Sequence, residues 1–472
     1  MFSIATKGAI LAASVLCGAA YTQEALADQV TALPGAENLD ITFNQFSGYL
    51  TVDGTKQMHY WFVESINDPA NAPVAFWTNG GPGCSGLLGF LTEQGPFRPN
   101  KDMTLSFNEY AWNQVANMVF IESPVGVGYS YSTAEDTSDD YQMDDAETAA
   151  DNYALIQAFM QRFPEYNSNS MYISSESYGG HYMPTLAKEI VDQNAAGQNP
   201  KLNFKGFAVG NPFTETYSGT PAMIDTYWGH QMIAAPVYKE FTDECRDAKI
   251  PNVTICEALF YKIYFGVGNI NPYALDYPVC LSDSVAAKGR GQRHALLRNI
   301  LGGAETESSR QIYEAILQSD NYEPCEDDYA TSYMNLPEVK AAIHVNDKIT
   351  WAECSRSIRY KQSDSRNSMV PIYQYLIDGG FNLDILVFSG DDDGVCATIG
   401  VQKWIWGLGY EVTGRMYQAY EVAGQMAGYA TKWAGAKLGF VTVHGAGHEV
   451  PAYKPEVALE LWKKYLNGEW TN

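Results

Sequence analysis

The chain contains several short apolar runs, and each run ends in a cluster of polar or glycine residues. These runs are residues 73–77, 115–121, 171–173, 207–209, 385–388 and 440–443. Apolar runs that end in turn residues are typical of strands buried on both faces of a sheet. Helical patterns occupy residues 144–163, 178–193 and 456–466. This alternation predicts an α/β fold whose central, mostly parallel sheet is flanked by helices.

The segment at residues 214–328 departs from this alternation. It holds four of the cysteines and a basic, glycine-bearing stretch at residues 288–293. We expect it to be an inserted cap subdomain over the active site. It would separate a first half of the core, residues 28–213, from a second half, residues 329–472. A run of helices with no role as a lid is the alternative.

The N-terminus has the features of a secretory leader. Residues 1–7 carry one positive charge, residues 8–20 are apolar, and Ala25-Leu26-Ala27 offers a small-residue cleavage site. The apolar segment is too short to span a membrane, and no later run of about 18 apolar residues follows. We therefore expect residues 1–27 to be a signal peptide. The mature chain would enter the secretory pathway and reach a vacuole, a lysosome or the cell exterior.

The composition of the chain disfavours some classes of binding partner. The formal net charge of −25 at pH 7 disfavours nucleic acid and anionic membranes. Hydrophobic residues make up 46% of the chain, which indicates a folded core. No metal or organic cofactor is implied, because no C-x-x-C pair occurs and Val125-Gly126-Val127-Gly128 lacks the third glycine of a dinucleotide-binding loop.

The segment Ser175-Glu176-Ser177-Tyr178-Gly179 lies between an apolar run and a helical pattern. A serine in this context fits a nucleophile elbow, a tight turn that needs small residues two positions before and after the serine. Ser175 stands where the common G-x-S-x-G pattern has its first glycine. The alternative is an ordinary serine at the N-terminus of a helix.

A serine nucleophile needs a histidine base and an acid that orients the base. In α/β-hydrolases these residues follow in the order Ser, Asp, His. Asp391-Asp392-Asp393 and then His448 supply that order after Ser177, each following an apolar run. Spacing alone does not choose among the three acids.

Other chemistries for these segments are weaker. A calcium loop is disfavoured because Val395 stands at a ligand position. Zinc bound by His444 and His448 is disfavoured because the glycines between them oppose a helix. The segment Asn79-Gly80-Gly81-Pro82-Gly83 can offer backbone N–H groups to an oxyanion, although a structural turn explains it equally well.

Taken together, these segments resemble the serine carboxypeptidase family, that of carboxypeptidase Y and the lysosomal protective protein. The resemblance extends from about residue 48 to residue 458, nearly the whole mature chain. The matching segments are Trp77-Thr78-Asn79-Gly80-Gly81-Pro82-Gly83-Cys84-Ser85, Pro124-Val125-Gly126-Val127-Gly128-Tyr129-Ser130, Glu176-Ser177-Tyr178-Gly179-Gly180-His181-Tyr182, Gly390-Asp391-Asp392-Asp393 and Gly447-His448-Glu449-Val450-Pro451. It implies an α/β-hydrolase fold with an inserted cap.

The resemblance also implies roles for single residues. Ser177 would be the nucleophile, His448 the base and Asp393 the orienting acid. The N–H groups of Gly81 and Tyr178 would form the oxyanion hole.

Four further residues would recognise the substrate. Asn79 and Glu176 would bind its C-terminal carboxylate, supported by Glu93 and Trp77. A protonated glutamic acid can donate a hydrogen bond to a carboxylate, whereas an ionised one repels it. This difference favours activity in acid.

Seven cysteines remain after removal of Cys17 with the leader, since the chain has eight. An odd number suggests three disulfides and one free thiol.

The sequon Asn252-Val253-Thr254 is open to glycosylation on an export route. Glu122 stands where the family more usually has Asp, which we expect to alter only local packing.

The resemblance implies the disulfide pairs Cys84–Cys354, Cys245–Cys256 and Cys280–Cys325. It also makes Cys396 a free thiol in the substrate-binding site.

The function implied by the resemblance is serine-type carboxypeptidase activity through an acyl-enzyme at acidic pH. Its substrates would be the C-termini of peptides and proteins, with no nucleic acid, membrane or cofactor involved, and a homodimer is left open. An acyltransferase built on the same triad and a non-enzymatic protective binding protein are the alternatives.

Overall fold

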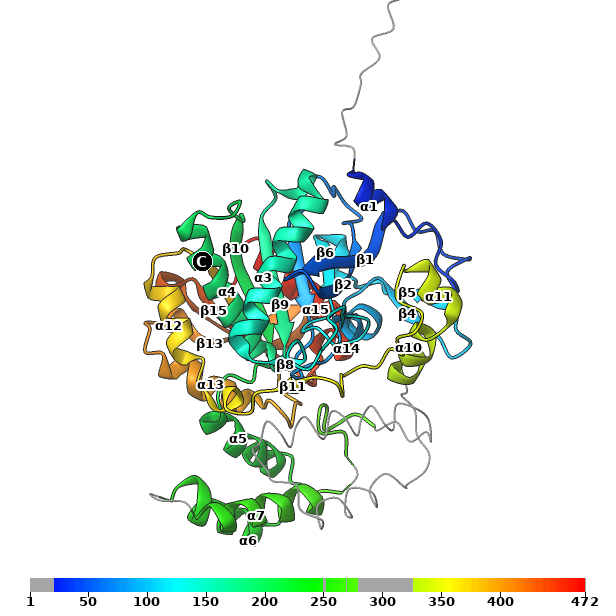
Figure 1. The fold of residues 1–472 in the computed structure, drawn as a ribbon. Helices are drawn as coiled ribbons and strands as arrows, with labels where there is room; N and C mark the ends of the chain where they lie inside the picture. The colour runs from blue at the N-terminus through cyan, green and yellow to red at the C-terminus, as the bar shows by residue number, and fades with distance from the viewer. Residues whose placement is uncertain (1–20, 249–251, 269, 279–325, 472) are drawn as a thin grey trace, which may run out of the picture.

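The computed structural model describes residues 21–248, 252–268, 270–278 and 326–471. An 11-stranded sheet runs through the centre of the molecule (Figure 1). Its path is β1 (Gln45–Val52), β2 (Lys56–Val63), β6 (Asn117–Ile121), β3 (Val74–Thr78), β9 (Met171–Glu176), β10 (Phe204–Gly210), β12 (Asp384–Gly390), β15 (Leu438–Val443), β14 (Gln425–Trp433) and β13 (Thr413–Val422), with β7 (Tyr131–Ser132) paired to β2.

The six central strands, from β6 to β15, are parallel to their neighbours. Each contains one of the apolar runs in the sequence, so the predicted α/β fold is confirmed. The outer strands β1, β2, β14 and β13 pair antiparallel and were not predicted. Two small sheets pair β4 (Phe97–Pro99) with β5 (Leu105–Phe107), and β8 (Gln142–Met143) with β11 (Arg359–Tyr360).

Alternate residues of the central strands enter two separate hydrophobic clusters, one on each face of the sheet. In β12, Ile385 and Val387 join the first cluster, whereas Leu386 and Phe388 join the second. This follows from the two-residue period of a strand. The first cluster is covered by α3 (Asp145–Arg162), α4 (Gly179–Ala196), α12 (Val370–Asp378) and α13 (Thr398–Gly407), and the second by α2 (Gly86–Leu88), α10 (Glu326–Met334), α11 (Pro337–Ala342), α14 (Val450–Tyr453) and α15 (Pro455–Leu466).

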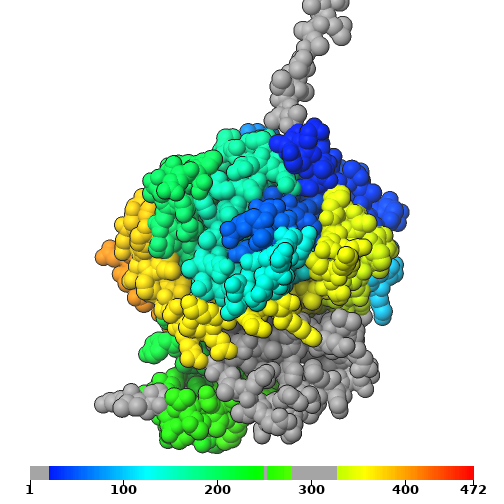
Figure 2. All heavy atoms as spheres, viewed as in Figure 1, coloured from blue at the N-terminus to red at the C-terminus, as the bar shows by residue number. Residues whose placement is uncertain are grey.

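The described part of the predicted cap contains α5 (Thr216–Gly229), α6 (Ala235–Phe241) and α7 (Val253–Gly266). In Figure 1, α6 and α7 lie below the sheet and α5 leads toward them from the core. The space-filling view from the same side shows α6 and α7 as a lobe under the main body (Figure 2). The predicted limits of the cap, residues 214 and 328, remain a prediction.

Residues assigned to the leader pack against the core. The helix α1 (Gln23–Ala27) buries Ala25 completely, and the ring of Tyr21 lies 5.0 Å from that of Phe46. The Thr22 hydroxyl donates to the Arg162 carbonyl at 2.7 Å. The predicted boundary after Ala27 therefore cuts through a packed element. The remainder of the predicted leader, residues 1–20, lies outside the described residues.

Among the described residues, no helix is long and apolar enough to cross a bilayer.

Candidate active site

Ser177 occupies a sharp turn between β9 and α4, with φ of 60°. This left-handed conformation is strained for a residue with a side chain, and such strain is a feature of nucleophile elbows. The turn is crowded: a Cβ added at Gly179 would lie 2.2 Å from Ser175 Oγ. Glycine at 179 therefore makes room for the serine that replaces the usual glycine at 175.

Asp393 and His448 meet at the carboxyl ends of β12 and β15. His448 Nδ1 lies 2.6 Å from Asp393 Oδ2, and both side chains are buried. Asp393 also accepts from Asn211 Nδ2 at 2.8 Å and from the backbone N–H of Val395 at 2.7 Å. These donors fix the orientation of the Asp393 carboxyl group, which can hold the histidine in one tautomer.

The other two acids of the run face elsewhere, so the geometry selects Asp393 as the partner of His448. Asp391 pairs with His444 Nδ1 at 2.8 Å on the surface. Asp392 contacts His230 Nε2 at 3.3 Å, and burial raises the pKa of its carboxyl.

The loop predicted to carry the oxyanion donors lies against the elbow. A Cβ added at Gly80 would lie 2.5 Å from the backbone nitrogen of Tyr178 and 2.8 Å from Ser177 Cβ. Only glycine permits this approach. Gly81 has φ of +118°, which also favours glycine. The backbone at Gly80, the residue before Gly81, thus lies against Ser177 and Tyr178, which is compatible with an oxyanion site at this turn.

Asn79 joins two acids beside the elbow. Its Nδ2 donates to Glu93 Oε1 and to Glu176 Oε1, each at 2.9 Å, while its Oδ1 accepts from Trp77 Nε1 at 2.9 Å. All four predicted carboxylate-binding residues are therefore in one buried cluster. Burial raises the pKa of Glu176 well above its usual range, and the charges of Glu93 and Glu449 raise it further.

Glu449 is an acid that the sequence reasoning did not single out. It follows His448 directly and is 7% exposed. Its adjacency to the predicted base was the available signal.

Cys396 is the free cysteine of the described residues and is buried. Its Sγ lies within 4.8 Å of ligand atoms of Asp393 and His448. Burial raises the pKa of its thiol well above the usual range, and the charge of Asp393 adds to this effect. Cys396 is therefore present as the neutral thiol at physiological pH.

A loop of the cap segment touches the triad. The backbone N–H of His448 donates to the backbone carbonyl of Tyr273 at 2.7 Å. The centroids of the two side-chain rings lie 5.1 Å apart. Nearby, Gly394 N donates to the Pro272 carbonyl at 2.9 Å and Leu275 N to the Asp392 carbonyl at 3.0 Å. These contacts were missed because the cap segment carries no motif.

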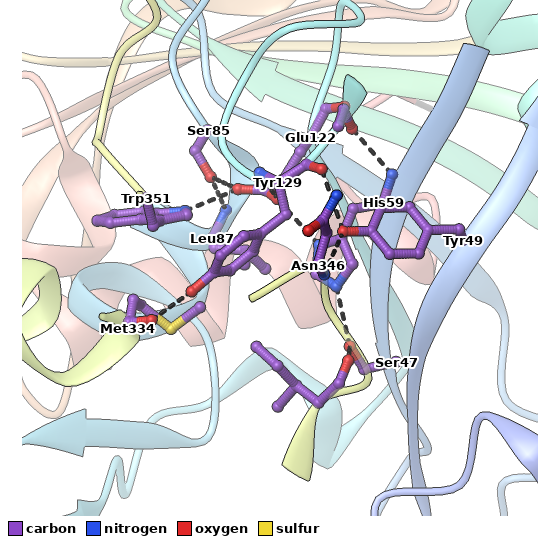
Figure 3. A network of polar contacts seen from close by, with 12 residues as sticks. Ser47, Tyr49, His59, Ser85, Leu87, Glu122, Tyr129, Met334, Asn346 and Trp351 are labelled. Carbon is purple, nitrogen blue, oxygen red and sulfur yellow. Dashed lines mark hydrogen bonds and ion pairs between the residues drawn. The ribbon is translucent and has the colours of Figure 1, made fainter. Parts of the chain in front are cut away.

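Glu122 lies fully buried at the centre of a polar network (Figure 3). Its Oε2 accepts from the Tyr129 N–H at 2.7 Å and lies 2.9 Å from His59 Nδ1. Its Oε1 accepts from Trp351 Nε1 at 2.8 Å and from the Ser85 hydroxyl.

This network reaches the active-site loop, because Ser85 also accepts from Leu87 N and so caps α2. The chain then continues from α2 to Glu93. The Glu122 carboxylate thus joins segments that are far apart in the sequence, and the expectation that Glu in place of Asp alters only local packing stays a prediction.

Two disulfides are present among the described residues, Cys84–Cys354 and Cys245–Cys256. The first joins the loop after Gly83 to the second half of the core, across 270 residues. The implied pair Cys280–Cys325 and the basic stretch at residues 288–293 lie outside the described residues. In the sequon, Asn252 caps α7 by accepting from the N–H groups of Thr254 and Ile255.

Two groups of described side chains have the composition of a metal site. One is Asp393, Cys396 and His448, which is the predicted triad region itself. The other is His230, Asp276 and Asp392, where the cap meets the loop after β12. His444, the zinc alternative for the sequence, pairs with Asp391 instead.

Comparison with known proteins identifies the family of this chain. The family model described as serine carboxypeptidase matches residues 34–468. The chain belongs to the serine carboxypeptidase family. Serine carboxypeptidase-like 25 of Arabidopsis thaliana is 37% identical over 456 residues, covering 95% of this chain and 93% of that protein. Serine carboxypeptidase 24 of the same plant is 35% identical over 455 residues, covering 94% and 92%.

A solved structure supports the fold of this serine carboxypeptidase-like protein. The prohormone-processing carboxypeptidase Kex1Δp from Saccharomyces cerevisiae superposes with a TM-score of 0.70 at 20% identity, covering 94% of this chain and 96% of that chain. The α/β-hydrolase fold is thereby confirmed. The serine carboxypeptidase-like family includes both carboxypeptidases and acyltransferases.

Proposed function

We propose that this protein is a serine carboxypeptidase that removes C-terminal residues from peptides and proteins in acid. The observation that carries the proposal is the buried cluster of Asn79, Glu93 and Glu176 beside the Ser177 elbow. A general serine hydrolase has no need for two buried acids on one amide next to its nucleophile.

The chemistry follows from the triad. Ser177 Oγ attacks the carbonyl of the last peptide bond while His448 takes its proton, and Asp393 stabilises the resulting imidazolium. The N–H groups of Gly81 and Tyr178 stabilise the oxyanion. His448 then protonates the leaving amino acid. In the second half of the reaction His448 takes a proton from water, and the water oxygen attacks the acyl carbonyl. His448 then returns the proton to Ser177 Oγ, which releases the shortened peptide.

Recognition of the C-terminus uses the acids in their neutral form. The raised pKa of Glu176 keeps a proton on this side chain, so it can donate to the substrate's carboxylate. Asn79 Nδ2 becomes a second donor when the substrate carboxylate displaces one of the two acids to which it donates, Glu93 or Glu176. An ionised pair would instead repel the substrate.

The test compares a blocked dipeptide with its C-terminal amide at about pH 5, between the ordinary pKa values of Glu and His. We expect rapid release of the free amino acid and slow reaction of the amide. Ser177→Ala should lower kcat by several orders of magnitude, whereas Ser363→Ala, at an exposed position, should not. Equal rates for dipeptide and amide would contradict carboxypeptidase specificity.

Acyl transfer is the second candidate, because the family includes acyltransferases with the same triad. In that reaction an alcohol replaces water in the deacylation step. Adding an acceptor alcohol to the acyl-enzyme would then give an ester instead of the free acid. A purely protective binding role, the third alternative, requires that Ser177→Ala retain all function.

The cellular setting is consistent with peptide hydrolysis. The disulfides and the family indicate the secretory pathway. Delivery to a vacuole or lysosome, or secretion into an acidic exterior, would supply the low pH that the Glu176 cluster requires. Peptide and protein C-termini would be its substrates there.

A further inference from the structure

Three side chains with metal-binding atoms meet where the cap segment contacts the core. His230 directly follows α5, Asp276 belongs to the loop that touches the triad, and Asp392 lies in the turn after β12. Their ligand atoms all lie within 4.8 Å of one another. Imidazole nitrogen and carboxylate oxygen are both ligands for zinc and related divalent metals.

The tautomer of His230 leaves one ring nitrogen facing Asp392. Nδ1 lies 3.0 Å from the backbone carbonyl of Thr226, and a carbonyl oxygen can only accept, so Nδ1 carries a proton. In the neutral ring Nε2 then has a free lone pair. This Nε2 lies 3.3 Å from Asp392 Oδ1. A histidine that donates from one nitrogen to a backbone carbonyl and presents the other nitrogen has the usual form of a metal ligand.

The Asp392 side chain supplies independent evidence for a cation. It is 3% exposed, and its Oδ1 is buried without a hydrogen-bond partner among the described residues. Its Oδ2 accepts from the backbone N–H of Asp276 at 3.0 Å, so this hydrogen bond leaves Oδ1 to face His230. A ring nitrogen and a carboxylate oxygen, both acceptors, therefore face each other. Either a metal ion or a proton has to lie between them.

The distance between these two atoms favours a metal ion over a proton. Four other histidine–carboxylate pairs in the described part of the chain are 2.6–2.9 Å long, the length of a charge-assisted hydrogen bond. The 3.3 Å contact between His230 and Asp392 is longer and lacks the geometry of a hydrogen bond. Two ligands bound tetrahedrally at about 2.0–2.2 Å from zinc lie about 3.4 Å apart. The observed separation matches the separation of two zinc ligands.

We infer that His230, Asp276 and Asp392 form a site for one divalent transition metal ion, with zinc as the best match. The Asp276 carboxylate is exposed, so it can turn to become the third protein ligand, and water would fill the fourth position. The His230 side chain is 25% exposed, which leaves a path for the ion. A metal here would tie the cap segment to the turn that carries Asp393. None of the three ligands belongs to the triad, and the inference does not depend on the proposed function.

The test adds zinc chloride to the full-length, chelator-treated protein at about pH 7.5, above the ordinary pKa of histidine. We expect zinc to bind in calorimetry and to raise the temperature of thermal unfolding. His230→Gln and Asp276→Asn should each weaken binding about 10-fold or more, because each removes a ligand, and should reduce the shift in unfolding temperature. His444→Gln is the matched control, since His444 pairs with the single carboxylate of Asp391 at the surface.

Cobalt(II), a spectroscopic substitute for zinc, separates this site from the triad region, where Cys396 offers a sulfur. Bound cobalt should show the visible bands of nitrogen and oxygen ligands, without a thiolate-to-metal charge-transfer band in the near ultraviolet. His230→Gln should remove these visible bands, whereas His444→Gln should retain them.

Three outcomes would overturn the inference. Binding that is unchanged in His230→Gln or in Asp276→Asn would show that the ion lies elsewhere. A thiolate band would place the ion at a cysteine. No binding at a large excess of zinc would mean that a proton joins His230 to Asp392. Because Asp276 is exposed, its variant keeps the test decisive if His230→Gln fails to fold.

Discussion

Asn79 donates its side-chain amide to Glu176 Oε1 at 2.9 Å, and both residues are buried. The same amide donates to Glu93, so two carboxyl groups lie against a single neutral donor. Two such acids cannot both ionise cheaply, and burial with the charge of Glu93 raises the pKa of Glu176. The pair therefore holds a proton more strongly than an isolated glutamic acid does.

KM for a peptide with a free C-terminus should therefore increase as pH rises through the raised pKa of Glu176. Below that pKa the acid is neutral and donates to the substrate, and above it the carboxylate repels the substrate. The effect should fall on KM more than on kcat, because ground-state binding is what is lost. Glu93→Gln removes one charge and should flatten the profile. Parallel KM profiles for a peptide and its C-terminal amide would rule out this role.

The contact between Asp393 and His448 predicts a large loss of turnover in Asp393→Asn. The amide would no longer hold His448 Nδ1–H as the carboxylate does, so the histidine would lose its tautomer and orientation. We expect kcat to fall about 10³- to 10⁴-fold with little change in KM. Asp391→Asn is the matched control, since Asp391 pairs with the exposed His444. A similar loss in both variants would contradict the selection of Asp393.

The network around Glu122 predicts a loss of stability in Glu122→Ala. Ser47 Oγ donates to the Ile343 carbonyl at 2.8 Å, so it accepts from His59 Nε2–H at 2.9 Å. His59 Nδ1 then faces Glu122 (Figure 3), and removing the carboxylate leaves this buried imidazole without its partner. The Tyr129 backbone N–H and Trp351 Nε1 also lose their acceptor. Each buried donor left unpaired costs about 1–3 kcal/mol, and we expect the free energy of unfolding to fall by the sum of these losses. Urea unfolding followed by tryptophan fluorescence would measure this change, with Glu109→Ala at an exposed position as the control. A loss in Glu122→Ala no larger than in the control would show that water replaces the carboxylate.

The sequence and the structure agree best where local pattern decides structure. The parallel strands were predictable because burial on both faces makes each of them continuously apolar, as in β12. The edge strand β13 was not predictable, because most of its residues are exposed and its sequence shows no hydrophobic alternation. Local pattern also indicated the sharp turn at Ser177, where the residues two positions before and after the serine must be small.

Contacts between distant segments were beyond such reasoning. The bond from Trp351 Nε1 to Glu122 joins residues 229 positions apart, and no local pattern in either segment indicates it. The same holds for Tyr273, which reaches His448 from the cap segment. Choosing Asp393 among three adjacent acids needed either the family resemblance or the fold, because the turn after β12 determines which carboxylate faces the histidine.

The packing of residues 21–27 predicts where the leader is removed. Tyr21 donates its hydroxyl to Glu64 at 2.5 Å, Thr22 bonds the Arg162 carbonyl, and Ala25 is fully buried. Cleavage after Ala27 would delete all three interactions and expose the apolar surface around Phe46. We therefore expect processing before Tyr21, where Gly18-Ala19-Ala20 supplies the small residues that a signal peptidase needs.

N-terminal sequencing of the exported protein should find Tyr21 or an earlier residue, and not Asp28. A chain engineered to begin at Asp28 should unfold at a lower temperature than one that begins at Tyr21, because its core lacks Ala25 and the Tyr21 ring. Thr22→Val in the longer chain removes both the hydroxyl bond to the Arg162 carbonyl and the N-cap of α1, where the hydroxyl accepts from the Ala25 N–H. It should cost about 1–2 kcal/mol. A natural N-terminus at Asp28, together with equal stability of the two chains, would contradict this prediction. The signal peptide would then end at Ala27. In that case α1 would be a segment of the precursor that the mature fold does not need.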